Sequence, residues 1–113
     1  MFFNVRPFRV FRQVLPDGGW GSPEWHEIGV VRGTLSPISG SDEIRNSQEF
    51  SDVRNVITCD DVYMGIVQEQ DELLGPRDRR YRVRLVMDYE NVLPHVALYV
   101  ANIQWEEGFR YGS

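Results

Sequence analysis

The sequence has 113 residues, 42% of them hydrophobic and 26% charged, a composition that is typical of one soluble globular domain. Twelve basic residues against seventeen acidic ones give a net charge of −5, which disfavours a free nucleic-acid binder, because phosphate contacts need a positive surface. All twelve basic residues are arginine, and Cys59 is the single cysteine, which excludes an intrachain disulfide and a multi-cysteine zinc site.

Two strands are predicted in the first third of the chain. The first runs from Phe8 to Leu15, where apolar and polar residues alternate, and it ends at a turn over residues 16–19 that contains Pro, Asp and two Gly. The second runs from Trp25 to about Leu35. Gly29 and Gly33 inside this strand predict a bulge or a bend.

A long polar segment follows at about residues 36–54. Structureless connections of this length are uncommon in compact domains and are usually functional or disordered, and we expect this loop to carry function. A turn or two of helix is predicted at Glu43–Phe50. The candidate functional residues of the loop are Ser39, Asp42, Glu43, Ile44, Arg45, Glu49, Phe50, Asp52 and Arg54.

The remaining strands lie in the second half. One is predicted in two pieces, 55–59 and 62–67, and an acidic turn follows at 71–75. The clearest alternation spans Tyr81–Tyr89 and predicts a half-buried strand with its odd-numbered residues on one face. The last strand, His95–Trp105, is apolar on both faces and should be central or covered by a partner. Five or six short strands predict an all-β fold, a single small barrel over residues 1–113.

No catalytic or metal-binding constellation stands out. Cys59 follows two apolar residues in a strand, so a buried structural thiol is the expected role. His26 and the pair Asp60 and Asp61 lack the spacing of metal ligands and are expected at the surface. We therefore expect no enzymatic activity, no cofactor and no bound metal.

A basic cluster and several tryptophans form the second set of candidates. Five of the twelve arginines fall between residues 77 and 84, where they would either contact phosphate or pair with carboxylates of a neighbouring strand or subunit. The net charge favours the second interpretation. Aromatic residues and arginine are enriched in protein interfaces. The expected interface residues are Arg79, Arg80, Arg82, Arg84, Trp20, Trp25 and Trp105.

The order and spacing of these features resemble a known family over about residues 5 to 105. The segments that carry the resemblance are Asp17–Trp20, Arg32–Glu43, Val56–Thr58, Asp71–Gly75, Tyr81–Val83 and His95–Leu98. They resemble the head-closure proteins of long-tailed bacteriophages, also called head–tail joining proteins or stoppers. This sequence departs from many relatives, which have a more basic segment directly after the long loop, because its arginines are concentrated at residues 77–84.

The resemblance implies a β-barrel in the neck of the virion, assembled in the host cytoplasm. Copies would form a ring, with a copy number expected to be a multiple of six, below the portal and adaptor proteins. The ring would close the exit channel after DNA packaging and offer its other face to tail proteins. In this family the long loop is the channel gate, which here corresponds to residues 36–54. Double-stranded DNA would pass without sequence-specific binding, and no membrane is involved.

Three alternatives remain open from the sequence. The chain could be a tail-terminator ring subunit, because such proteins are also small and rich in strands. It could be a β-barrel nucleic-acid-binding module that uses Arg79–Arg84 and exposed aromatic residues as a stacking platform. An enzyme is the third alternative, disfavoured because no nucleophile is paired with a base. We expect a monomer before assembly.

Overall fold

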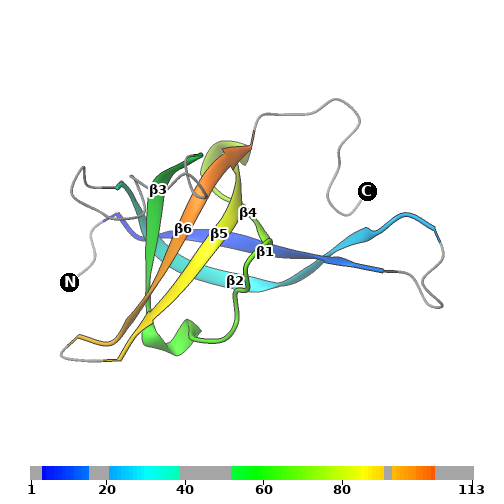
Figure 1. Cartoon of the computed structure of the whole chain (residues 1–113). Coiled ribbons are helices and arrows are strands. Elements are labelled where there is room, and N and C mark those ends of the chain that lie inside the picture. The colour runs from blue at the N-terminus through cyan, green and yellow to red at the C-terminus, as the bar shows by residue number, and fades with distance from the viewer. Residues whose placement is uncertain (1–3, 16–20, 39–51, 91–92, 104–113) are drawn as a thin grey trace.

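The computed structural model describes residues 4–15, 21–38, 52–90 and 93–103 (Figure 1). Within these ranges, six strands form a closed antiparallel barrel in the order β1-β2-β3-β6-β5-β4, which confirms the predicted all-β barrel. The strands are β1 (Arg6–Val14), β2 (Glu24–Pro37), β3 (Val53–Asp60), β4 (Glu72–Leu74), β5 (Arg80–Tyr89) and β6 (His95–Ile103), and two 3₁₀ turns are η3 (Asp61–Tyr63) and η4 (Pro76–Asp78).

The antiparallel order gives the barrel two distinct ends. At one end of the barrel, which we call the upper end, β1, β3 and β5 begin, β2, β4 and β6 finish, and η4 joins β4 to β5. In Figure 1, β3 and β5 begin at the top, whereas β1 begins and β2 finishes at the left. At the lower end, η3 follows β3 and a short connection joins β5 to β6. Register places Val53 opposite Ala101 at the upper end and Asp60 opposite His95 at the lower end. The two ends therefore present different sets of connecting residues.

The core consists of the side chains that point into the barrel. Alternate residues of β6, namely Val96, Leu98 and Val100, face inward, a choice of face that the sequence, apolar on both faces here, left open. Contributions from the other strands fill the interior, and the fully buried ones are Phe8, Val10, Val31, Ile57, Leu73 and Val83. Cys59 is 1% exposed in this cluster, so the predicted burial of its thiol is confirmed.

The inward face of β5 changes part-way along the strand. Tyr81 and Val83 point into the core, but a register shift follows, after which Val86 packs against the core and Met87 is 38% exposed. A β-bulge adds one residue and so exchanges the two faces beyond it. The prediction that all odd-numbered residues of this strand share one face is therefore wrong beyond Val83. A second shift, opposite Gly29 in β2, agrees with the bulge predicted near that glycine.

Three predicted boundaries are wrong. Residues 62–67 are not a strand: they contain part of η3 and a turn in which Gly65 has a φ of 80°, which extended backbone cannot accommodate. The predicted acidic turn contains β4, which pairs with β1 and β5 and closes the barrel. The predicted loop 36–54 is shorter, because residues 36–37 and 53–54 belong to strands and Ile38 N–H donates to Arg54 O at 3.1 Å.

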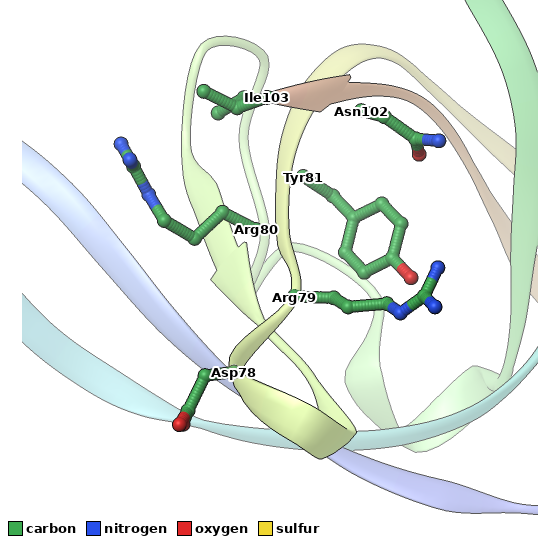
Figure 2. A pocket seen from close by; sticks show the side chains of 6 residues that line it. All are labelled: Asp78, Arg79, Arg80, Tyr81, Asn102 and Ile103. Atoms are coloured by element: carbon green, nitrogen blue, oxygen red, sulfur yellow. The ribbon is translucent and has the colours of Figure 1, made fainter. Parts of the chain in front are cut away.

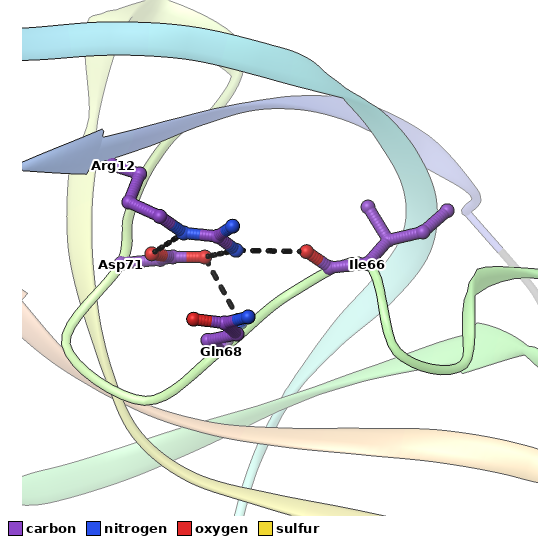
Figure 3. Close-up of polar contacts among 4 residues, drawn as sticks. All are labelled: Arg12, Ile66, Gln68 and Asp71. Atoms are coloured by element: carbon purple, nitrogen blue, oxygen red, sulfur yellow. Dashed lines mark hydrogen bonds and ion pairs between the residues drawn. The ribbon is translucent and has the colours of Figure 1, made fainter. Parts of the chain in front are cut away.

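The lower end is closed by the chain between η3 and β4. Asp71 accepts hydrogen bonds from Arg12 Nε at 2.9 Å and from Arg12 Nη2 at 2.8 Å, and also from the Gln68 N–H at 2.9 Å (Figure 3). Arg12 Nη2 donates in addition to Ile66 O at 3.0 Å. Bidentate pairing of this kind fixes geometry as well as charge, so β1 holds this segment across the barrel.

A two-stranded arm extends from the barrel. We define it as residues 12–15 and 21–28, where β1 and β2 pair only with each other, because β4 reaches no further along β1 than Phe11 and β3 no further along β2 than Gly33. Figure 1 shows this arm projecting to one side. Val14, Leu15 and Ile28 are 39%, 64% and 39% exposed on it. The outer edges of the arm have no neighbouring strand among the described residues.

Candidate functional site

Glu72 is the centre of a buried ion-pair cluster on the outer face of the barrel. Glu72 pairs in register with Arg82, and the neighbouring pair Leu73 and Tyr81 points into the core, which turns Glu72, Arg80 and Arg82 outward together. Glu72 Oε2 lies 3.1 Å from Arg80 Nη2, and Oε1 lies 2.6 Å from Arg82 Nη2. The side chains of Glu72 and Arg80 are only 1% and 3% exposed. This pairing matches the prediction that these arginines meet carboxylates of a neighbouring strand.

The bulge separates Arg84 from this cluster. Arg84 Nη1 donates to Asp52 Oδ2 at 2.7 Å, which joins a predicted interface residue to a predicted loop residue. Asp52 directly precedes β3, so the contact ties the described end of the loop to β5. Arg54, also predicted in the loop, lies in β3 and donates to Val53 O at 3.2 Å.

The upper end carries a hollow of about 260 Å³ with apolar walls and a basic rim. Phe8 and Tyr81 form part of the wall, with ring centroids 6.2 Å apart in an edge-to-face arrangement. Burial raises the pKa of Tyr81, and the charge of Arg79 opposes this effect. The remaining lining residues are Asn4, Arg6, Leu35, Pro76, Arg77 and Arg79.

Arg6, Arg77 and Arg79 differ from the arginines of the Glu72 cluster because they are exposed and no carboxylate pairs with them in the described part of the chain. Arg32, on the outer face of β2, also lacks a carboxylate partner there. An exposed guanidinium without a partner keeps its five donors available for an external anion.

The turn between β4 and β5 positions the rim. A Cβ at Gly75 would lie 2.8 Å from the Phe8 ring, so only glycine lets the chain pass over that ring. Arg77 and Asp78 follow with φ values of 61° and 58°, a conformation that costs a non-glycine residue free energy. Figure 2 shows the result: Arg79 lies beside Tyr81 on one side of the strand, whereas Arg80 points to the other side. The Asp78 side chain points away from the Tyr81 ring.

The lower end has the opposite charge. Asp60, Asp61 and Glu69 are exposed there, together with Asp88 and Glu90 at the end of β5, and none of the five has an ion-pair partner among the residues that the structure describes. Val62 and Leu93, both at this end, are 70% and 75% exposed. The barrel therefore has a basic upper end with a hollow and an acidic lower end with projecting apolar side chains.

The other predicted site residues divide into two groups. Trp25 is half-buried on the arm, far from the arginines of β5. The rest lie outside the described residues, so the predictions for them stay predictions: Ser39, Asp42, Glu43, Ile44, Arg45, Glu49, Phe50, Trp20 and Trp105.

Groups with catalytic or metal-binding chemistry are dispersed. Burial, and secondarily the charge of Asp60, raise the pKa of Cys59 to about 12. His26 lies at the surface of the arm, 3.2 Å from Glu24 Oε2, as predicted for a surface histidine. Within the described ranges no group of three metal-ligating side chains comes together, and no helix there is long and apolar enough to cross a membrane.

Two features of this surface are not evident in the sequence. Glu72 reads there as part of a turn, because a strand of three residues is too short for a periodic pattern. Arg6 is 71 residues away from Arg77, and only the closing of the barrel brings both to one rim. The run of five arginines between residues 77 and 84 is the one signal in the sequence that indicates this end.

No protein-family model matches this chain, and a search of curated proteins finds no match either.

Proposed function

We propose that this protein is a structural subunit of a phage neck, a head-closure protein that forms a ring below the portal and adaptor and closes the DNA exit channel after packaging. The proposal rests on the family resemblance of the sequence, and the observation that carries it furthest is the arm. A closed barrel has no free strand edge, yet this one extends a two-stranded arm with open edges and exposed apolar residues.

The arm suits a protein that works by assembly. Open edges accept a further strand by main-chain hydrogen bonds, and Val14, Leu15 and Ile28 offer apolar surface beside them. An isolated two-stranded ribbon is only marginally stable, so an arm of this kind gains order when a partner covers it. We assign it to contacts with adaptor or tail proteins in the virion neck.

In this function the connection between β2 and β3 is the channel gate. The connection leaves the end of β2 and enters the start of β3 at the upper end, where Asp52 forms an ion pair with Arg84. Residues 39–51, which hold most of the predicted gate, lie outside the described residues. The net charge of the whole chain is −5, and a ring of such chains would repel a polyanion, so DNA would pass through it without being held.

The decisive experiment removes the protein from the phage that encodes it. Without it we expect heads that package DNA, fail to retain it and have no tails, and added purified protein should restore both retention and tail attachment. Heads that keep their DNA but lack tails would favour the tail-terminator alternative. Intact, tailed and infectious particles would exclude both roles.

A second experiment separates the gate from the scaffold. Replacing residues 39–51 by a short Gly-Ser linker keeps Ile38 and Asp52, whose contacts hold the strand ends together. We expect a folded protein that enters the neck and supports tail attachment but allows DNA to leak. Full DNA retention with this variant would contradict the gate assignment.

The nucleic-acid-binding module remains the second candidate because of one observation. Arg77 and Arg79 are exposed at the rim of the hollow, where a phosphate could pair with them. Tight binding of a single-stranded oligonucleotide, with affinity that falls steeply as salt rises, would favour it.

A further inference from the structure

The two ends of the barrel are complementary in both charge and shape. The upper end carries Arg6, Arg77 and Arg79 around a hollow of about 260 Å³. The lower end carries five exposed carboxylates, whose residues are Asp60, Asp61, Glu69, Asp88 and Glu90. Among the described residues neither set is neutralised within the chain, so each end presents charge that an external group of opposite sign can meet.

We propose that the upper end of one copy of this protein binds the lower end of the next copy, head to tail. Arg77 and Arg79 of one copy pair with the Asp60 and Asp61 region of its neighbour, and an exposed apolar side chain, Val62 or Leu93, enters the hollow. This contact rests on the proposed function. It adds to that function the two surfaces through which neighbouring subunits of the ring would bind each other.

The apolar surfaces support the same pairing. The walls of the hollow are formed in part by Phe8, Leu35 and Tyr81, which give a buried apolar surface to any group that enters. Val62 is 70% exposed and directly follows Asp60 and Asp61, so one apolar side chain and two carboxylates project side by side from the lower end. An apolar centre with a charged rim is the common design of protein interfaces.

A second copy fits this site better than nucleic acid does. The hollow has a volume of about 260 Å³ at one end of the barrel, whereas a nucleic-acid site has to follow a phosphate backbone over several nucleotides. The chain as a whole repels a polyanion, because its net charge is −5. A neighbouring copy instead offers a few carboxylates grouped around an apolar side chain.

The contact is heterologous, because the two surfaces are different patches of the same chain. Such contacts repeat from copy to copy. If the successive rotations add up to one full turn, the copies close into a ring, and otherwise they continue as a filament. Exposed ion pairs contribute little individually. We therefore expect the contact to be weak for free subunits and to become stable when a template holds many copies together.

Cross-linking of two cysteine variants tests the head-to-tail arrangement. Pro76→Cys marks the upper end and Val62→Cys marks the lower end, and Cys59 does not interfere because it is buried. With a short bismaleimide, a mixture of the two variants should give a cross-linked dimer, whereas each variant alone should not. Equal cross-linking of either variant with itself would overturn the heterologous contact.

Charge exchange tests the chemistry of the contact. Asp61→Arg in the Val62→Cys chain should lower the yield about fivefold, and Arg79→Glu in the Pro76→Cys chain should do the same. The two changes together should restore it. The control Arg32→Glu in the Pro76→Cys chain reverses an exposed charge on the outer face of β2 and should leave the yield unchanged. Failure of the paired change to restore cross-linking would contradict the proposal.

The outcomes separate this contact from the proposed function. If the variants do not cross-link but the protein still restores DNA-filled heads, the head-to-tail contact is contradicted and the proposed function stands. If the variants cross-link but the protein does not restore the heads, the proposed function is contradicted and the contact stands. Binding of a labelled double-stranded oligonucleotide that Arg79→Glu abolishes, without any cross-link, would instead assign the upper end to nucleic acid.

Discussion

Two groups of arginines in this barrel have opposite surroundings. Arg80 and Arg82 flank the buried carboxylate of Glu72 on the outer face, whereas Arg77 and Arg79, only a few residues earlier, are exposed at the rim of the hollow. The difference arises at η4, where the chain turns before it enters β5. Neighbouring arginines can therefore serve structure or recognition according to whether a strand brings them a carboxylate.

The energetic consequences of the two groups also differ. A buried ion pair gains little over an apolar replacement, but loss of one partner leaves the other charge desolvated. An exposed arginine without a partner can be changed at little cost to folding. Substitutions in the Glu72 cluster should thus affect stability, and substitutions at the rim should affect association.

The largest effect is expected for Glu72→Gln. This change leaves the Arg80 guanidinium buried without the Glu72 carboxylate and should lower the free energy of unfolding by about 3 kcal/mol, measured by urea denaturation. Asp52→Asn is the matched control, because the Asp52 side chain is 49% exposed, and it should cost less than about 1 kcal/mol. Equal losses for both variants would contradict the distinction between buried and exposed pairs.

The thiol of Cys59 provides the contrast to Glu72, because it is buried and has no ion-pair partner among the residues that the structure describes. The pKa of Cys59 is raised to about 12 from an ordinary value of 9.0, because the folded protein favours the neutral thiol. The contribution of this group to the free energy of unfolding is therefore fully present below pH 9. That contribution is lost as the pH rises from 9 to 12. By pH 11 the loss should reach about 2 to 3 kcal/mol.

Cys59→Ala isolates this contribution. The variant is less stable at neutral pH, because it leaves a small cavity, but its free energy of unfolding should fall less between pH 9 and 11 than that of the unchanged protein. Parallel pH profiles for the two proteins would mean that the thiol does not contribute.

The placement of the rim depends on Gly75. Gly75→Ala puts a Cβ 2.8 Å from the Phe8 ring and should destabilise the protein by about 2 kcal/mol. At Gly29 nothing lies within 4 Å of an added Cβ, so Gly29→Ala should be close to neutral. Thermal unfolding of the two variants provides the comparison.

The smallest effect is expected at the rim itself. Arg77→Gly relieves a φ of 61° and should raise the free energy of unfolding by up to about 1 kcal/mol while weakening association. Arg79→Gly also removes a rim arginine, but its φ is −76°, so no strain is relieved and stability should fall slightly. A loss of stability in both variants would show that the turn is not strained.

Sequence reasoning succeeded where the pattern is local and long enough to repeat. The alternation in the first half of β5 identified its inward residues, and the turn predicted over residues 16–19 separated the first two strands. The strand predicted at residues 62–67 is wrong, because the Val and Ile content of this segment favours a strand, whereas Gly65 has a positive φ. The bulge in β5 adds one residue, which no alternating pattern can locate in advance.

The candidate site could be predicted only in part from the sequence, for a different reason. The arginines of β5 could be recognised as a cluster, but whether each is paired depends on residues distant in sequence. Asp52 is 32 residues from Arg84, and Asp71 is 59 residues from Arg12. A carboxylate count along the chain cannot distinguish the paired arginines from the exposed ones at the rim.

The three-residue strand β4 has a consequence for the order in which the protein folds. Closing the barrel requires Arg9, Val10 and Phe11 to pair with Leu74, Leu73 and Glu72, across more than half of the chain. Contacts between such distant residues form slowly, because the intervening loop must first be ordered. The edge of β1 therefore stays open during synthesis until residue 74 has emerged from the ribosome.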